Sequence, residues 1–157
     1  MLSRFFVYVV AFAMMLQLAY ALSKKDINSI VNTHNKFRKI HSAPALKWDK
    51  KLAQYAQNWS NKCVFQHSGG PYGENLAMGY GSLNAAIQAW YDEGKSYNYN
   101  NPGFSSSTGH FTQVVWKGTT KIGCGLGKCN GRNILTCSYK APGNMLGDFP
   151  NNVLPPK

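Results

Sequence analysis

The chain has 157 residues, of which 44% are hydrophobic and 15% are charged, a size and mixture typical of one globular domain rather than of a disordered chain. Seventeen lysines and arginines against six acids give a formal net charge of +11, which excludes an acidic solvating protein. An anionic membrane or cell-wall surface is therefore the expected electrostatic partner, although charge alone does not choose between the two.

Residues 1–21 have the pattern of a secretory signal peptide. Arg4 precedes an apolar run from Phe5 to Leu18, and the small-residue sequence Ala19-Tyr20-Ala21 follows it. The run is shorter than the ~20 residues that a membrane-spanning helix needs, and no later segment qualifies. We therefore predict a secreted, extracellular protein with a single domain over residues 22–157 that ends in a short tail.

Three amphipathic helices are predicted in the first part of this domain. The first is expected to begin at the capping residue Asp26, the second after Asp49, and the third at Ser82, running to about Glu93. Residues 67–81 lie between the second and third helices and are too rich in glycine and proline for a regular helix.

Strands are predicted in the last part of the domain. Apolar and polar residues alternate in HFTQVVWK at 110–117, which predicts a first strand. Two more, KIGCGLGK at 121–128 and NILTCSYK at 133–140, flank Asn130-Gly131, a strong hairpin signal. Helices first and strands last favour an α+β domain with an antiparallel sheet.

The hairpin predicts how the four cysteines pair. A two-residue turn at 130–131 places Cys124 opposite Cys137 on a rung where Cα atoms approach to ~4.5 Å, within disulfide reach. Cys63 is then left to Cys129, a link whose longer loop should stabilise more, by on the order of 4 kcal/mol. A longer turn would shift the register, and zinc ligation by the thiolates is the weaker alternative.

Two histidines and both glutamates are candidates for chemistry. Glu93 shares a predicted helix face with Trp90 and should point inward, where a carboxylate needs a partner, unless the helix frays before it. His67, Glu74 and His110 complete a set of imidazoles and carboxylates suited to zinc or to acid-base work. Their spacing is not diagnostic, because the chain has no HExxH motif and no nucleophile elbow.

The remaining two histidines are expected to be structural or idle. His34 lies on an apolar helix face and is predicted to be a hydrogen-bonded core residue, whereas His41 lies in a basic loop and suggests no role.

Five ordered motifs resemble those of the CAP superfamily, which includes cysteine-rich secretory, antigen 5 and pathogenesis-related class 1 proteins. They are HNKFR at 34–38, HSGGPYGENLA at 67–77, AIQAWYDE at 86–93, GHFTQVVWKGT at 109–119 and ILTCSYKAPGN at 134–144. The resemblance extends over about residues 27–150 and is nearest to the fungal Pry-type branch of secreted sterol-binding proteins.

The resemblance implies an alpha-beta-alpha sandwich with a central cleft. It places a tetrad of two histidines and two glutamates in that cleft at His67, Glu74, Glu93 and His110, which can bind a divalent ion, zinc or magnesium, and it implies no organic cofactor. It also implies the same disulfide pairing. No common reaction is established for such proteins, so no catalytic residue is assigned and the chain is expected not to be an enzyme.

The segment YNYNNPGFSSSTG at 97–109 is predicted to be a surface loop. Tyr97, Tyr99 and Phe104 resemble the aromatic loop to which sterol binding by Pry-type proteins is attributed, and Pro102 and Gly103 are suited to letting the loop open. Aromatic side chains cover a rigid apolar ligand at low entropy cost. The alternative is that these rings only pack the loop onto the third helix.

Two surface features accompany these sites. Basic residues crowd the first two predicted helices, which favours an anionic surface or simply solubility. Asn58-Trp59-Ser60 is an N-glycosylation sequon on the predicted outer face of the second helix.

The leading hypothesis is a secreted protein that binds and carries sterols or other small lipids. Alternatives are an immune-modulating or antimicrobial effector and a metal-assisted hydrolase that uses the tetrad. No motif indicates nucleic-acid binding.

Overall fold

The computed structural model describes residues 22–157, so the predicted signal peptide and its cleavage site lie outside the described residues. The helices are α1 (Lys24–Ile40), α2 (Lys50–Ser60), α3 (Leu83–Asp92), the 3-10 turn η1 (Glu93–Ser96), α4 (Gly109–Val115) and α5 (Phe149–Asn152). The strands are β1 (Lys47–Trp48), β2 (Gly73–Met78), β3 (Lys121–Cys129) and β4 (Arg132–Lys140). In this part of the chain no helix combines the length and the apolar character needed to cross a bilayer.

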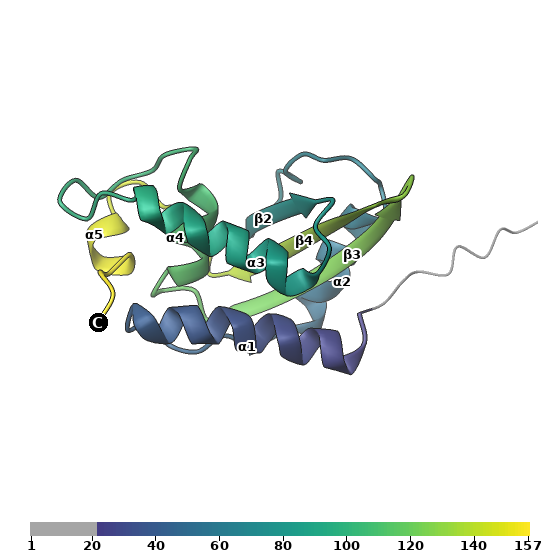
Figure 1. Ribbon diagram of the computed structural model, residues 1–157, viewed down its shortest axis with the longest axis horizontal. Coiled ribbons are helices and arrows are strands. Elements are labelled where there is room, and N and C mark those ends of the chain that lie inside the picture. Colours follow the sequence, from purple (N-terminus) through teal and green to yellow (C-terminus); the bar gives the residue numbers. More distant parts are fainter. Residues whose placement is uncertain (1–21) are drawn as a thin grey trace, which may run out of the picture.

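The four strands form one sheet in the order β1-β3-β4-β2, with α2 against one face and α1, α3 and α4 grouped on the other (Figure 1). The pairs β2–β4 and β3–β4 are antiparallel, while the two-residue strand β1 runs parallel to β3 at the edge. The predicted α+β sandwich is confirmed, with a sheet that is mixed because of β1.

The face of the sheet toward α2 is built from glycine and small hydroxyl residues. A Cβ added to Gly123, Gly125 or Gly127 of β3 would lie 2.1 or 2.2 Å from a backbone atom of α2. The alternating glycines therefore let the helix backbone pack directly on the strand. The Ser60 hydroxyl is 2.9 Å from that of Thr136 on β4.

The opposite face carries the main hydrophobic core. Ile122, Cys124 and Leu126 of β3 alternate with these glycines and pack with residues of α1, α3 and α4. Because successive strand residues point to opposite faces, one nine-residue strand serves both layers.

The predicted hairpin and both disulfides are confirmed. Cys124 lies opposite Cys137 in the register, and Asn130 and Gly131 form the turn with positive φ angles of 48° and 79°. The Cys124–Cys137 and Cys63–Cys129 bonds have Cα–Cα distances of 4.1 and 5.4 Å. The second bond ties the segment after α2 to the end of β3.

Local capping sets where the helices begin. The Asp49 side chain caps α2 as predicted, and Ser82, where the third helix was predicted to begin, is the N-cap of α3. The first helix begins earlier than predicted, because Ser23 is its N-cap. The Ser23 hydroxyl accepts from the backbone N–H of Asp26, and the Asp26 carboxylate, at the third helical position, accepts from the backbone N–H of Ser23. This reciprocal capping box satisfies two backbone groups that would otherwise lack partners.

The strand predicted at 110–117 is wrong, since residues 109–115 form helix α4. Residues 111–115 are all buried, so a seven-residue helix surrounded by protein shows no helical periodicity. Its ends are held by distant side chains: Glu93 accepts hydrogen bonds from the backbone N–H groups of His110 and Phe111, and Arg38 donates to the carbonyls of Val114 and Trp116. A carboxylate at the start and a guanidinium at the end also suit the helix dipole.

Strand β2 was not predicted from the sequence. Residues 73–78 form β2, which pairs with β4 along its whole length, in a segment for which the sequence excluded only helix. Neighbouring glycines and Pro71 obscure the strand in the sequence.

Candidate ligand and metal site

The first His–Glu pair lies where the loop after α2 meets the start of β2. His67 Nδ1 is 2.9 Å from Glu74 Oε1, and the backbone N–H of Ser68 donates to the same oxygen. The His67 side chain is 67% exposed and that of Glu74 is 6% exposed. The hydrogen bond to Glu74 raises the pKa of His67. Burial alone would raise the pKa of Glu74, but hydrogen bonds from His67 and Ser68 outweigh it and the pKa is lowered.

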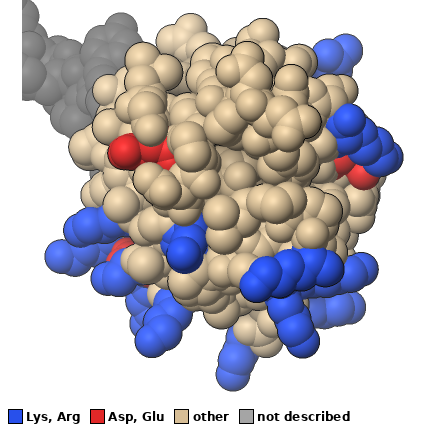
Figure 2. Space-filling view, turned by 90° about the vertical axis from the view of Figure 1, so that its left-hand side faces the viewer, with Lys and Arg blue, Asp and Glu red and all other residues tan. Residues whose placement is uncertain are grey.

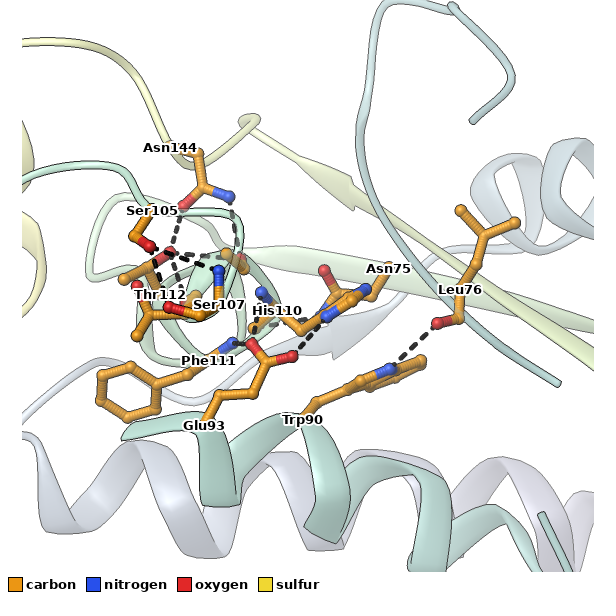
Figure 3. A network of polar contacts seen from close by, with 12 residues as sticks. Asn75, Leu76, Trp90, Glu93, Ser105, Ser107, His110, Phe111, Thr112 and Asn144 are labelled. Atoms are coloured by element: carbon orange, nitrogen blue, oxygen red, sulfur yellow. Dashed lines mark hydrogen bonds and ion pairs between the residues drawn. The ribbon is translucent and has the colours of Figure 1, made fainter. Parts of the chain in front are cut away.

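The second pair joins η1 to the start of α4. His110 Nδ1 is 2.7 Å from Glu93 Oε1, while Glu93 Oε2 accepts the backbone N–H groups of His110 and Phe111 (Figure 3). The His110 ring also stacks on Trp90, with centroids 6.0 Å apart and an interplanar angle of 15°. Glu93 therefore points inward as predicted, although α3 ends one residue before it.

The two pairs meet at one cavity of about 180 Å³. Its lining includes His67, Glu74 and His110, and Glu93 holds His110 through the short contact described above. The rest of the lining is Asn75, Phe104, Ser106, Gly109 and Asn144. Residues from four separate segments thus lie around or behind this cavity, as two pairs rather than as the single tetrad that the sequence predicted.

The side chains around the cavity do not form a four-ligand metal site. Among residues 22–157 no three His, Cys, Asp or Glu side chains come close enough together to hold an ion. In both His67 and His110, however, Nδ1 is hydrogen-bonded to a carboxylate. When the ring is neutral, this contact places the proton on Nδ1 and leaves the lone pair on Nε2. Carboxylates placed in this way orient histidine ligands and raise their basicity. The second oxygen of Glu74, Oε2, is buried without a hydrogen-bond partner in the described structure.

The predicted aromatic loop divides into buried and exposed parts. Tyr97 is 8% exposed and packs on Phe111, with Tyr99 against it edge to face at 4.9 Å between centroids. Phe104 is 56% exposed and lines the cavity. Pro102 and Gly103 are half-buried between these parts. The two tyrosines therefore anchor the loop, and Phe104 is the ring available to a ligand.

Two asparagines of the site were missed from the sequence. Asn75 donates hydrogen bonds to the backbone carbonyl of His110 and to the Tyr139 hydroxyl. The Asn144 side chain accepts a hydrogen bond from the Thr112 hydroxyl at 2.5 Å and donates one to the Gly109 carbonyl at 2.9 Å (Figure 3). Both lie inside motifs quoted above, in GENLA and APGN, and their side chains tie β2 and the segment after β4 to α4.

The other predicted features lie elsewhere. Asn58 is exposed on α2, as its sequon requires. His34 is buried and hydrogen-bonded to Ile30 and Tyr139, as predicted. His41 differs from expectation, because it is 2% exposed and contacts the Leu154 carbonyl and the Tyr91 hydroxyl. The C-terminal tail folds back over it, which the basic local sequence does not show.

Comparison with known proteins identifies the class. The family model "CAP: Cysteine-rich secretory protein family" matches residues 31–139. The chain belongs to this family.

Among individual proteins, the chain is 54% identical over 134 residues to Protein PRY2 of Saccharomyces cerevisiae, covering 81% of this chain and 40% of that one. It is 48% identical over 132 residues to Secreted protein RBT4 of Candida albicans, covering 77% and 36%. The chain thus spans less than half the length of these two relatives.

Solved structures share the fold. BmVAL-1 superposes with a TM-score of 0.69 at 31% identity, covering 80% of this chain and 81% of that one. NaASP2, whose structure was determined with Zn2+, superposes with a TM-score of 0.71 at 24% identity, covering 87% and 88%.

Proposed function

We propose that this chain is a secreted CAP-domain protein that binds and carries a sterol or a similarly small lipid. The observation that supports it most is the position of Phe104, a large exposed ring that lines the cavity beside several polar side chains. A sterol has one hydroxyl on a rigid apolar body, so it matches a site where hydrogen-bonding side chains lie beside an exposed aromatic ring.

Binding of such a ligand requires the aromatic loop to move. The cavity of about 180 Å³ is smaller than the roughly 300 Å³ or more of pockets that enclose small-molecule ligands. Asn100, Asn101, Ser105 and Ser107 make hydrogen bonds to partners no more than three residues away. The tip of the loop is thus held mainly by itself, while Tyr97 and Tyr99 stay packed at its base.

We also propose that His67 and His110 hold a divalent ion, with Glu74 and Glu93 orienting the two rings. Neutral imidazole favours zinc over magnesium, which prefers oxygen ligands. When bound, the ion supplies a positive charge that attracts a ligand oxygen. The protein itself orients the two rings. The buried carboxylate of Glu74 contacts the His67 ring, and the buried ring of Trp90 stacks on the His110 ring.

Secretion is supported by the same framework. Residues 22–157 contain two disulfides and no free cysteine, which fits an oxidising compartment. The predicted signal peptide and the secreted relative RBT4 point the same way.

The test changes Phe104 alone. Phe104→Ala should raise the Kd for a labelled sterol about tenfold, because it removes the exposed aromatic surface without touching the core. A triple change that includes Tyr97 and Tyr99 is less informative, since these rings pack on the core and their loss disturbs folding.

The matched control is Tyr80→Ala. Tyr80 is 44% exposed and comes just after the end of β2, whereas the cavity lies at the start of that strand. The control should bind sterol as the unmodified chain does. Unchanged affinity in a folded Phe104→Ala variant would contradict the assignment of the ligand to this loop.

A further inference from the structure

Large apolar side chains protrude next to the mouth of the cavity. Phe104, Met145 and Leu146 are 56%, 50% and 85% exposed, and Leu146 is the most exposed of the large apolar residues in the described chain. Phe104 and Asn144 both line the cavity, and both approach Gly109. Met145 and Leu146 directly follow Asn144, so the three apolar side chains belong to two loops that meet at Gly109.

The second loop holds its apolar tip in place. The backbone N–H of Asp148 donates to the Met145 carbonyl at 3.1 Å, which closes a turn with Leu146 and Gly147 at its centre. Gly147 has a φ of 87°, as the third position of a type II turn requires. Asn144 fastens the loop to α4 through Thr112 and Gly109. The fold therefore exposes Leu146 through a fixed turn and not at a frayed end.

Positive charge surrounds this end of the molecule. Lys117 and Lys140 are exposed, and neither forms an ion pair with any residue in the range 22–157. Asp148, two residues after Leu146, is the one acid after Glu93 in the sequence, and it is exposed. On the face that includes α5 and the loop before α4, basic side chains lie around the lower half and the right rim, and fewer acidic side chains lie at the left and the right (Figure 2).

We propose that Phe104, Met145 and Leu146 form a membrane-docking tip that inserts into the surface of an anionic bilayer. Protruding apolar side chains gain free energy by entering the boundary between headgroups and acyl chains, and nearby lysines are attracted to anionic headgroups. A protein partner would require a larger complementary face than two narrow loops provide. Docking in this orientation turns the cavity mouth toward the bilayer, where a lipid enters; this role of the tip rests on the proposed function.

The experiment measures sedimentation of the secreted chain with vesicles that contain no sterol. On vesicles of 70% phosphatidylcholine and 30% phosphatidylserine, Leu146→Glu should lower the partition coefficient about tenfold or more, and Leu146→Ser should lower it less. The unmodified chain should bind more weakly to pure phosphatidylcholine. Tyr80→Glu is the charge-matched control, because Tyr80 is exposed but follows the opposite end of β2, and it should retain most of the binding.

Three outcomes would overturn the proposal: equal partitioning of Leu146→Glu and the unmodified chain, an equal loss in Tyr80→Glu, or self-association without vesicle binding. Sterol affinity measured without vesicles separates the two proposals. Leu146→Glu should keep that affinity. A chain that docks on vesicles but binds no sterol would contradict only the proposed function. A chain that binds sterol but does not dock would contradict only the membrane-docking tip.

Discussion

At the scale of single residues, two buried side chains link α1 to the rest of the fold. Arg38 is fully buried and has no carboxylate partner in the described chain. Instead it donates to four carbonyls, those of Pro44, Val114, Trp116 and Thr119. Burial lowers its pKa to about 10, so it remains charged at physiological pH. The cation is satisfied by hydrogen bonds from several segments, and its loss would leave these carbonyls without partners.

His34 makes the folded state sensitive to acid. Its Nδ1–H donates to the Ile30 carbonyl, and its Nε2 accepts from the Tyr139 hydroxyl. This arrangement requires the neutral ring. Burial, aided by the nearby positive charge of Arg38, lowers the pKa of His34 to about 4. Tyr139 and Trp90, the other side chains that face it, are neutral across this range.

The lowered pKa predicts how stability changes with pH. Below about pH 6.5 the unfolded chain takes up a proton at His34, whereas the folded chain does so only below about pH 4. The free energy of unfolding should therefore fall by about 3 kcal/mol from this residue as pH drops from 6.5 to 4. Urea unfolding at several pH values should show a smaller fall for His34→Gln, which does not titrate. An identical slope in both proteins would show that His34 does not set it.

At the scale of secondary-structure elements, β3 shows how the sequence permits two helical layers. Gly125 is central, since its added Cβ would lie 2.2 Å from the Cα of Gln57 in α2. The backbone of α2 cannot yield without losing its own contacts on β3 and β4.

We predict that Gly125→Ala lowers the free energy of unfolding by about 3 kcal/mol or more, because overpacking here is against backbone rather than a flexible side chain. Gly81→Ala is the control, since an added Cβ there meets no atom within 4 Å. Thermal or urea unfolding of both variants gives the comparison. A Gly125→Ala protein as stable as the control would mean that α2 does not rest on the strand in this way.

Elements were predictable from the sequence where local chemistry determines them. Asp49 and Ser82 are local caps, and Asn130-Gly131 fixes a register by itself, so α2, α3 and the β3–β4 hairpin could be found. Helix α4 could not, because Glu93 and Arg38, which complete its ends, are distant in the sequence.

The candidate site was predictable in part for a similar reason. The residue types of His67, Glu74, Glu93 and His110 suggested shared chemistry, and the family motifs assigned them to one cleft. Their division into two pairs depends on the β2–β4 pairing and on the position of α4, which only the fold defines. The burial of Tyr97 likewise follows from packing on Phe111 in a helix that the sequence pattern presented as a strand.

At the scale of the whole molecule, the disulfide-linked sandwich brings distant segments to one cavity. The Cys63–Cys129 bond closes a span of 66 residues, and the loop that starts there carries His67 to the start of β2. Helix α4 presents His110 from the other side, and the loops around Phe104 and Asn144 form the rim. The rigid scaffold thus positions the polar interior, while the outer loop is left to adapt to a ligand.

The most direct test of lipid carriage is to identify what the protein retains. The secreted chain is exchanged with a total lipid extract and repurified, and the retained species are identified by mass spectrometry, with parallel samples in chelator and in added zinc. The account predicts retention of a sterol or a similarly small lipid, well above the amount held by Phe104→Ala, and a change in that amount when the chelator removes a bound ion. Retention of no lipid above the level of Phe104→Ala in any of the samples would contradict it.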